Sequence, residues 1–317
     1  MPNVKVLKMI KVFGHNSPDT DCTGSAILYA WYLNTHTSEK AEAFVLGSLN
    51  KETQFVLKRW NIPEPTLLES VSNYDQVVIV DTNNPQELFP NITDTNILKI
   101  IEHHRLAGFE TKGPIEMTLK PLASTASVIY GLVEKELDAQ IKNIPENIKG
   151  IFLSCILSDT LAFRSPTTTP ADKDIAENLA KELKLDLHSY ADEMFAAKSD
   201  ISDFTDEGLI HIDSKKSALG DKNIRISVVE TTNPEMILAR KESIVATIQK
   251  VLAKETDVHE ILFFIIDILK EEATVLVYND LIKQIIEKSF DVTIDGDTKV
   301  LPGVVSRKKQ IIPALKF

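Results

Sequence analysis

The sequence predicts an α/β fold in which a mainly parallel sheet flanked by helices is followed by a smaller α/β domain. The first indication is the run at residues 76–80, Gln-Val-Val-Ile-Val, whose apolar character on both faces is typical of a strand buried inside a parallel sheet. The second is that runs of this kind alternate with helical patterns, and that the alternation restarts after a polar, weakly helical segment at residues 185–199. We therefore expect two domains, residues 1–190 and 191–317.

The first domain is expected to alternate short strands with amphipathic or buried helices. Its strands are expected at residues 4–12, 40–46, 76–80 and 96–101. Its helices are expected at residues 26–31, 52–60, 124–137, 145–161, 169–183 and 185–199. Thr169 and Pro170 form an N-cap and first-turn pair at the start of one of them. The helix at 145–161 is apolar around much of its circumference, so we expect it to be buried.

The second domain shows the same kinds of pattern. Its strands are expected at residues 223–229, 261–268 and 273–278. Its helices are expected at residues 234–253 and 280–290. The sequence then ends in a segment in which Arg307, Lys308 and Lys309 are adjacent, and a solvated basic turn is one interpretation of it.

Composition and charge exclude several classes of protein. The formal net charge of −11 opposes non-specific binding to nucleic acid, although an anionic substrate can still bind where the charge is locally positive. Cys22 and Cys155 form no C-x-x-C pair, so neither a disulfide framework nor a thiolate zinc site is expected. The longest strongly apolar stretch, at 261–266, is too short to span a membrane, and lysines interrupt the N-terminal segment where a signal peptide needs an apolar core. We expect a cytoplasmic protein without a membrane or nucleic-acid partner.

Ionisable side chains follow three of the predicted strands and end one predicted helix. They are His15, Asp19, Asp21, Asp81, His103, His104 and Asp159. A single residue of this kind is more often a helix cap or a hydrogen-bonding core residue, and the loop at 13–25 by itself can be a polar turn with an aspartate cap. Because the carboxyl ends of parallel strands meet at one edge of a sheet, we nevertheless expect the seven to lie together.

These seven side chains have the composition of a divalent metal site. Imidazoles and carboxylates without a thiolate favour Mn²⁺ or Co²⁺, with Zn²⁺ also open. Seven donors are too many for one ion that keeps an open position. The natural arrangement is therefore two ions that share a bridging carboxylate.

Five short motifs, taken in order, resemble one known family. They are Gly14-His15-x-x-Pro18-Asp19-x-Asp21, Val80-Asp81, His103-His104, Ser158-Asp159-Thr160 and Ser306-Arg307-Lys308-Lys309-Gln310. Together they are similar to the family II (manganese-dependent) inorganic pyrophosphatases of the DHH phosphoesterase superfamily, over essentially the whole chain. The resemblance implies a DHH domain followed by a DHH-associated domain, with the active site in the cleft between them, and a homodimer formed through the first domain.

The resemblance also implies the metal ligands. One ion would be held by His15, Asp19 and Asp81. The other would be held by Asp21, Asp81, His103 and Asp159, so that Asp81 bridges the two. The implied cofactors are two Mn²⁺ (or Co²⁺) ions per subunit, with Mg²⁺ arriving with the substrate. The implied reaction is hydrolysis of pyrophosphate to two phosphates by a metal-bridged hydroxide.

For the substrate, the resemblance implies that His104 faces it and that Lys215, Arg307 and Lys308 bind its phosphates. From the residues alone, Lys215 lies beside Lys216 and a solvated lysine is the commoner case. In a regular strand Arg307 and Lys309 would share a face and Lys308 would not, so the pairing of Arg307 with Lys308 implies irregular backbone there.

Two departures from the family pattern leave other functions open. Glu102 stands where the family has Asp, and Thr82 begins a segment that differs from the family's Asp-His-Asn/Ser-Glu. Changes in residues that contact ligands typically alter metal affinity or activity by about 10–100-fold. The alternatives are a superfamily phosphodiesterase acting on short oligonucleotides or cyclic dinucleotides, and a metal-binding protein without activity. Against the first, the sequence contains no two adjacent glycines, whereas those relatives carry a Gly-Gly-Gly-His-type segment.

Overall fold

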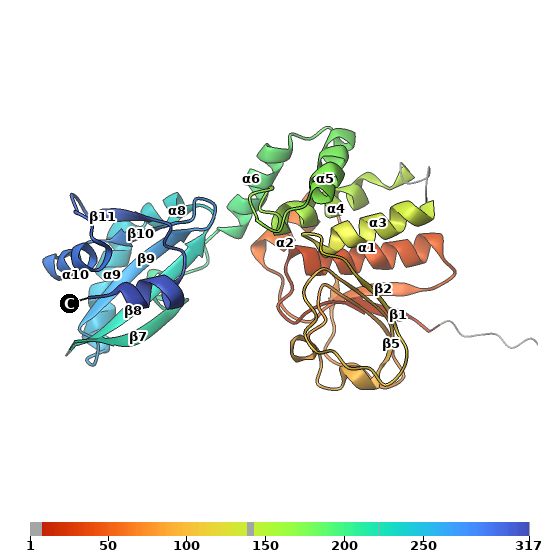
Figure 1. The fold of residues 1–317 in the computed structure, drawn as a ribbon, viewed down its shortest axis with the longest axis horizontal. Helices are drawn as coiled ribbons and strands as arrows, with labels where there is room; N and C mark the ends of the chain where they lie inside the picture. The colour runs from red at the N-terminus through yellow and green to blue at the C-terminus, as the bar shows by residue number, and fades with distance from the viewer. Residues whose placement is uncertain (1–7, 138–142, 221, 317) are drawn as a thin grey trace, which may run out of the picture. The chain divides into compact units, whose positions relative to one another are not determined.

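The structure is a computed structural model that describes residues 8–137, 143–220 and 222–316. The chain divides into two compact units between Ala197 and Lys198. Each unit contains one sheet with helices packed on it, which confirms the predicted α/β class and the smaller size of the second domain. Figure 1 shows the elements in chain order.

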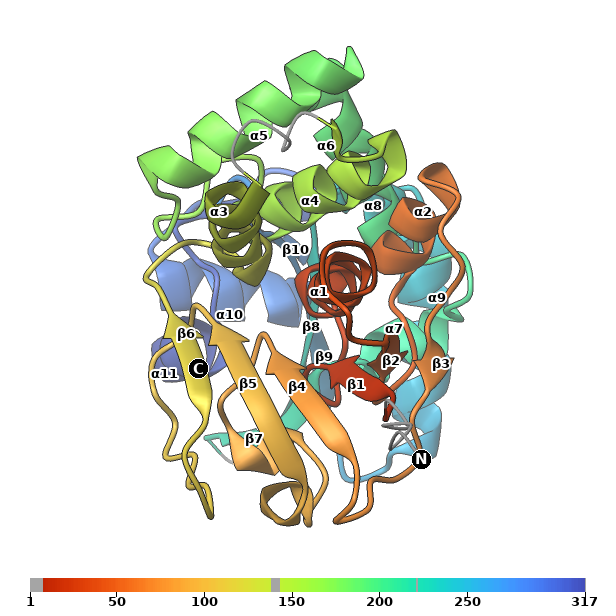
Figure 2. The same cartoon turned by 90° about the vertical axis from the view of Figure 1, so that its right-hand side faces the viewer.

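The sheet of the first unit has six strands in the order β3-β2-β1-β4-β5-β6, and each neighbouring pair is parallel. The strands are β1 (Ile10–Phe13), β2 (Ala41–Val45), β3 (Thr66–Leu67), β4 (Gln76–Val80), β5 (Asn96–Glu102) and β6 (Glu116–Leu119). Figure 2 shows them side by side in this order. Since all six run in one direction, their carboxyl ends meet at one edge, as expected from the sequence.

Helices cover one face of this sheet. They are α1 (Thr20–His36), α2 (Lys51–Arg59), α3 (Thr125–Leu137), α4 (Glu146–Asp159), α5 (Pro170–Leu183) and α6 (Leu187–Lys198), with short 3₁₀ turns η1 (Pro85–Glu87) and η2 (Ile92–Asp94). Figures 1 and 2 show α1, α3 and α4 above the strands. The predicted burial of α4 is confirmed, since its residues from Gly150 to Ser158 are all buried. Thr169 caps α5 through a reciprocal capping box with Asp172.

The sheet of the second unit has five strands in the order β11-β10-β9-β8-β7. Its strands are β7 (Ser214–Leu219), β8 (Lys222–Thr231), β9 (Glu260–Asp267), β10 (Glu272–Leu276) and β11 (Thr298–Pro302). Its helices are α7 (Asp206–His211), α8 (Pro234–Leu238), α9 (Lys241–Lys254), α10 (Asp280–Phe290) and α11 (Ile312–Ala314), with a π-helical turn η4 (Arg307–Ile311). The pair β8–β9 is parallel and the other pairs are antiparallel. Every residue of β9 is buried, because apolar clusters pack on both of its faces.

The structure corrects three of the expected elements. The strand expected at 4–12 begins only at Ile10, and residues 4–7 lie outside the described residues. The helix expected at 234–253 is two helices, broken at Arg240, whose guanidinium donates to Asp206 Oδ1 and to the carbonyl of Ile201. The helix expected at 145–161 ends at Asp159, since residues 161–163 adopt left-handed backbone with φ of 48°, 50° and 72°.

Four strands have no counterpart among the expected elements: β3, β6, β7 and β11. Each of them lies at an edge of its sheet. Among the described residues, no helix has the length and apolar content that a membrane crossing requires.

Candidate metal centre

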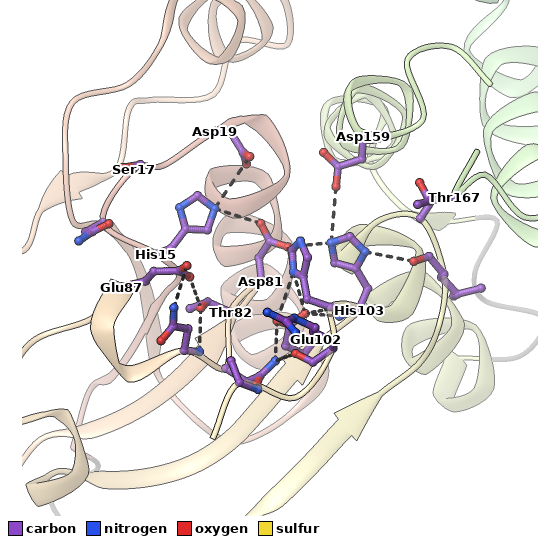
Figure 3. A pocket seen from close by; sticks show the side chains of 18 residues that line it. His15, Ser17, Asp19, Asp81, Thr82, Glu87, Glu102, His103, Asp159 and Thr167 are labelled. Atoms are coloured by element: carbon purple, nitrogen blue, oxygen red, sulfur yellow. Dashed lines mark hydrogen bonds and ion pairs between the residues drawn. The ribbon is translucent and has the colours of Figure 1, made fainter. Parts of the chain in front are cut away.

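The loops after β1, β4 and β5 and the end of α4 border a pocket of about 840 Å³ in the first unit. Six of the seven predicted metal-site residues line it: His15, Asp19, Asp81, His103, His104 and Asp159. The seventh, Asp21, is fully buried in the first turn of α1. Figure 3 shows Asp81 between the rings of His15 and His103, with Asp159 directed at His103 from above. The expectation that these side chains lie together is therefore met for all seven.

Asp81 lies at the centre of the cluster. It follows β4 directly and is buried, and its backbone has a φ of 59°, which is rare for a residue other than glycine and is associated with functional sites. Its Oδ2 lies 3.4 Å from His15 Nε2, whereas its Oδ1 lies 3.3 Å from His103 Nε2. Thr125 Oγ1 donates a hydrogen bond of 2.9 Å to Oδ1. The two oxygens thus face different imidazoles, which is the arrangement of a bridging carboxylate.

Asp19 serves both the helix and the site. Its Oδ1 accepts a 2.9 Å hydrogen bond from Cys22 N and so caps α1, which confirms the alternative interpretation of the loop as an aspartate cap. Its Oδ2 lies 3.9 Å from His15 Nε2. The cap and the candidate ligand are therefore the same side chain, because the two oxygens point to different neighbours.

Asp21 anchors the start of α3 from below the pocket. Its oxygens accept hydrogen bonds from Thr125 N at 2.6 Å and from Ala126 N and Ser124 Oγ, both at 3.1 Å. Burial, followed by the charge of Asp81, raises the pKa of Asp21 to about 7. A carboxyl group in this position gains a negative charge easily only when a cation lies nearby.

His103 presents a ring nitrogen suited to a metal ion. Its Nδ1 lies 3.1 Å from the carbonyl of Leu122, which assigns the proton to Nδ1 and leaves the lone pair on Nε2. Nε2 is buried and has no hydrogen-bond partner within the described residues, although it lies 3.3 Å from Asp81 Oδ1 and 3.7 Å from Asp159 Oδ2. A lone pair facing two carboxylates is unfavourable, so Nε2 needs either a proton or a metal ion between it and the carboxylates, and its position suits a metal ligand.

The pKa shifts reflect both the like and the opposite charges in this cluster. Burial and the neighbouring Asp21 and Asp81 raise the pKa of Asp159 well above its usual range. Burial opposes, but the two neighbouring imidazoles outweigh it, so that the pKa of Asp81 is lowered. Burial alone would lower the pKa of His103, but the contact with Asp81 raises this pKa to about 9. Ligand atoms of Asp21, Asp81, His103 and Asp159 all lie within 4.8 Å of one another.

Glu102, one of the departures from the family pattern, holds the histidine pair in place. It is buried, and its carboxylate accepts hydrogen bonds from the backbone N–H groups of His103 and His104, the latter at 2.6 Å. It also accepts from Asn83 Nδ2 at 2.9 Å and lies 3.2 Å from His104 Nδ1. The hydrogen bond to Glu102 raises the pKa of His104, against a smaller opposing effect of burial. Asn83 and Thr125 were not among the predicted site residues; a polar start to the helix at 124–137 was the one available signal for Thr125.

Three predicted substrate-binding cations belong to the second unit. Arg307 Nη2 lies 2.7 Å from Asp213 Oδ1, while its Nε and Nη1 are buried without a hydrogen-bond partner among residues that the structure describes. Lys308 and Lys215 are exposed. Lys216, the neighbour of Lys215 in the sequence, forms an ion pair of 2.9 Å with Asp257. The π-helical turn at Arg307–Ile311 agrees with the irregular backbone that pairing Arg307 with Lys308 requires.

Comparison with known proteins agrees with this geometry. Residues 9–158 match the DHH family, N-terminal domain, and residues 192–316 match the DHHA2 domain. The manganese-dependent inorganic pyrophosphatase of Bacillus subtilis is 38% identical over 311 residues, 98% of each chain. The crystal structure of a putative family II inorganic pyrophosphatase from Methanococcus jannaschii shares 34% identity with a TM-score of 0.63, covering 96% of this chain and 98% of that one. An exopolyphosphatase-related protein from Bacteroides fragilis shares the fold, with a TM-score of 0.50 and 13% identity over 97% of this chain and 90% of that one.

Proposed function

The chain belongs to the family of manganese-dependent inorganic pyrophosphatases, and we propose that it hydrolyses inorganic pyrophosphate to two phosphates in the pocket of the first unit. The observation that carries the proposal is the geometry of Asp81, whose two oxygens face the ring nitrogens of His15 and His103 at 3.4 and 3.3 Å. One carboxylate between two imidazoles suits a pair of divalent ions better than it suits a solvated turn.

We further propose which residues hold two Mn²⁺ (or Co²⁺) ions. His15, Asp19 and Asp81 hold one, and Asp21, Asp81, His103 and Asp159 hold the other. The buried, unpartnered Nε2 of His103 and the close approach of three carboxylates support this assignment. When bound, the ions neutralise charge on phosphate oxygens and lower the pKa of a water from about 15.7 toward 7, and a further Mg²⁺ accompanies the substrate.

The residues of the chain bind and orient the pyrophosphate. Arg307, Lys308 and Lys215 bind phosphate oxygens, and two buried nitrogens of Arg307, Nε and Nη1, have no hydrogen-bond partner among the described residues. Glu102 raises the pKa of His104, and this ring stabilises or protonates the leaving phosphate oxygen. We also expect a homodimer formed through the first domain, which sedimentation analysis would measure, and a cytoplasmic location.

The experiment that tests the proposal is a hydrolysis assay on metal-stripped protein, in which released phosphate measures pyrophosphate hydrolysis and chromatography of nucleotide products measures phosphodiester cleavage. Pyrophosphate, a short oligonucleotide and a cyclic dinucleotide are supplied separately, each with Mn²⁺ or with Mg²⁺ alone. We expect rapid phosphate release from pyrophosphate with Mn²⁺ and none from the nucleotides. Cleavage of a nucleotide in preference to pyrophosphate would overturn the substrate assignment, and the absence of any hydrolysis would leave a metal-binding protein without activity.

A further inference from the structure

One buried acidic residue beside the metal centre belongs to none of its candidate ligand groups. Glu52 lies in the first turn of α2, and its side chain is fully buried. Burying a carboxylate is unfavourable unless hydrogen bonds compensate it. Two hydroxyl groups provide them for Oε1: Thr20 Oγ1 donates to this oxygen at 2.8 Å, and Ser158 Oγ donates to it as well.

The two donors come from the segments that carry the metal ligands. Thr20 stands between Asp19 and Asp21 at the start of α1, and Ser158 immediately precedes Asp159 at the end of α4. A single carboxylate oxygen therefore connects two segments that together supply three of the six proposed ligands. The hydroxyls are themselves buried, so water does not compete for them.

The surrounding packing holds the same junction. Cys155 Sγ donates to the carbonyl of Thr20 at 3.3 Å, which joins α4 to α1 one turn before Ser158. A Cβ on Gly24 would lie 2.1 Å from Cys155 Sγ, so the close approach of the two helices requires glycine there. Asn50 caps α2 through Thr53 N at 2.8 Å and thereby fixes the turn that carries Glu52.

Without a cross-link, the two segments would tend to separate. Asp21, Asp159 and Asp81 are acidic groups crowded within one cluster, and their mutual repulsion acts between α1, α4 and β4. A constraint between Thr20 and Ser158 opposes that movement whether or not a cation is bound. The constraint therefore acts on the positions of the metal ligands, as do other groups that hydrogen-bond near a metal site and orient its ligands without binding the metal.

We propose that Glu52 is a positioning residue of the metal centre, which sets the spacing between the Asp19–Asp21 segment and Asp159 by accepting hydrogen bonds from Thr20 and Ser158. The inference rests on the proposed function only in that the pocket holds a divalent ion. It concerns the affinity of the site for metal, so its test measures metal binding rather than hydrolysis.

The test uses the full-length, metal-stripped protein and calorimetric titration with Mn²⁺. Glu52→Ala removes the acceptor, and we expect the Mn²⁺ dissociation constant to rise by about 10–100-fold. Glu52→Gln keeps Oε1 as an acceptor for both hydroxyls, so we expect affinity within about threefold of the original. Equal losses in the two variants would overturn the proposal, because they would assign the effect to charge rather than to the cross-link.

Glu260→Gln is the matched control. Glu260 is a buried acid of the second unit that accepts hydrogen bonds from Tyr278 Oη and Asn279 Nδ2. We expect this variant to lower the thermal stability of the metal-free protein while Mn²⁺ affinity is unchanged. If it weakens Mn²⁺ binding as strongly as Glu52→Ala does, the effect reflects general destabilisation and the proposal fails.

Ser158→Ala and Thr20→Val keep the proposal testable should Glu52→Ala not fold. Each removes one donor, and each is expected to weaken Mn²⁺ binding by several-fold. Where Glu52→Ala does fold, Ser158→Ala should have no further effect in that background. Full additivity, or unchanged Mn²⁺ affinity in both single variants, would refute the cross-link. A protein that binds Mn²⁺ in this Glu52-dependent way but leaves pyrophosphate intact would refute the proposed function and retain this inference.

Discussion

The two units differ in how they surround their acidic side chains. In the first unit, Asp21, Asp81 and Asp159 are close to one another, and burial together with Asp81 raises the pKa of Asp21 to about 7. In the second unit, Glu255 meets Arg225 at 2.5 Å and Lys216 at 3.4 Å. Burial opposes, but these partners outweigh it and lower the pKa of Glu255 to about 2.

This difference distinguishes a candidate metal site from a structural network of ion pairs. The network around Glu255 is complete, since each charge already has a partner of opposite sign. In the acidic cluster of the first unit, Asp81 and Asp159 lie near the imidazoles of His15 and His103, and repulsion between the carboxylates still raises the pKa of Asp159. Perturbed pKa values of buried, mutually repelling groups in a pocket are typical of functional sites. Opposite responses to metal and pH are therefore expected from the two units.

The largest effect is expected from Asp81→Ala, because both proposed ions lose a ligand. Phosphate release from pyrophosphate with Mn²⁺ should fall by at least about 10³-fold, more than the roughly 10²–10³ typical of losing one stabilising hydrogen-bond donor. Steady-state assays of phosphate release measure it. Asp94→Ala, which removes an exposed partner of Lys112, is the control and should retain full activity. Near-normal turnover of Asp81→Ala would rule out the bridging role.

Arg307→Ala should separate the two units by function. The loss of charge-assisted hydrogen bonds worth about 1.5–3 kcal/mol should lower kcat/KM by about 10–100-fold while Mn²⁺ affinity is unchanged. Lys309→Ala is the matched control, since Lys309 is exposed in the same turn and has no proposed role. Similar small effects of both variants would favour a solvated basic turn, and weaker Mn²⁺ binding by Arg307→Ala would contradict the division between the units.

The sequence predicts buried strands well and edge strands poorly. The strand at 76–80 is found as expected, because a run buried on both faces needs apolar residues throughout. Strands β3, β6, β7 and β11 were missed, and each is an edge strand. The sequence of β7, Ser-Lys-Lys-Ser-Ala-Leu, has no continuous apolar pattern; it is a strand because β8 pairs with it. Edge strands depend on a neighbour that the local sequence does not specify.

The same limit applies to the site. The seven candidate residues were found because their types are unusual at the ends of strands, which is a local signal. Their partners were not found: Leu122 contacts His103 through a backbone carbonyl, which any residue could supply. From the sequence, Glu52 is an ordinary polar residue of a predicted helix. Only the structure shows that Thr20 and Ser158 donate hydrogen bonds to it. The supporting contacts depend on tertiary structure, so residue type alone does not reveal them.

Asp159→Asn should show opposite effects with and without metal. Because the folded pKa of Asp159 is raised, the metal-free protein loses stability as pH rises from about 4 through that pKa. The asparagine side chain of the variant does not ionise, so the variant keeps this stability. At pH 8 in chelator, the variant should therefore unfold at the higher temperature, by about 2–4 °C for each kcal/mol of repulsion relieved. With Mn²⁺ the order should reverse, since the variant loses a ligand. Thermal unfolding across pH measures both effects. If the order of the two unfolding temperatures is the same with and without Mn²⁺, repulsion at Asp159 does not distinguish the two units.

Glu255→Gln should give the smallest effect and the opposite pH dependence. Because the folded pKa of Glu255 is lowered to about 2, its ion pairs stabilise the protein above the ordinary glutamate pKa, and this contribution is lost as pH falls toward 2. At pH 7 the variant should lose about 0.5–1 kcal/mol, with the difference shrinking in high salt and near pH 2. Urea unfolding at several pH values measures it, and Mn²⁺ should leave the difference unchanged. A Mn²⁺-dependent difference would show that the charges of the second unit are coupled to the metal centre, and the contrast between a self-complete network and a cation-dependent cluster would no longer hold.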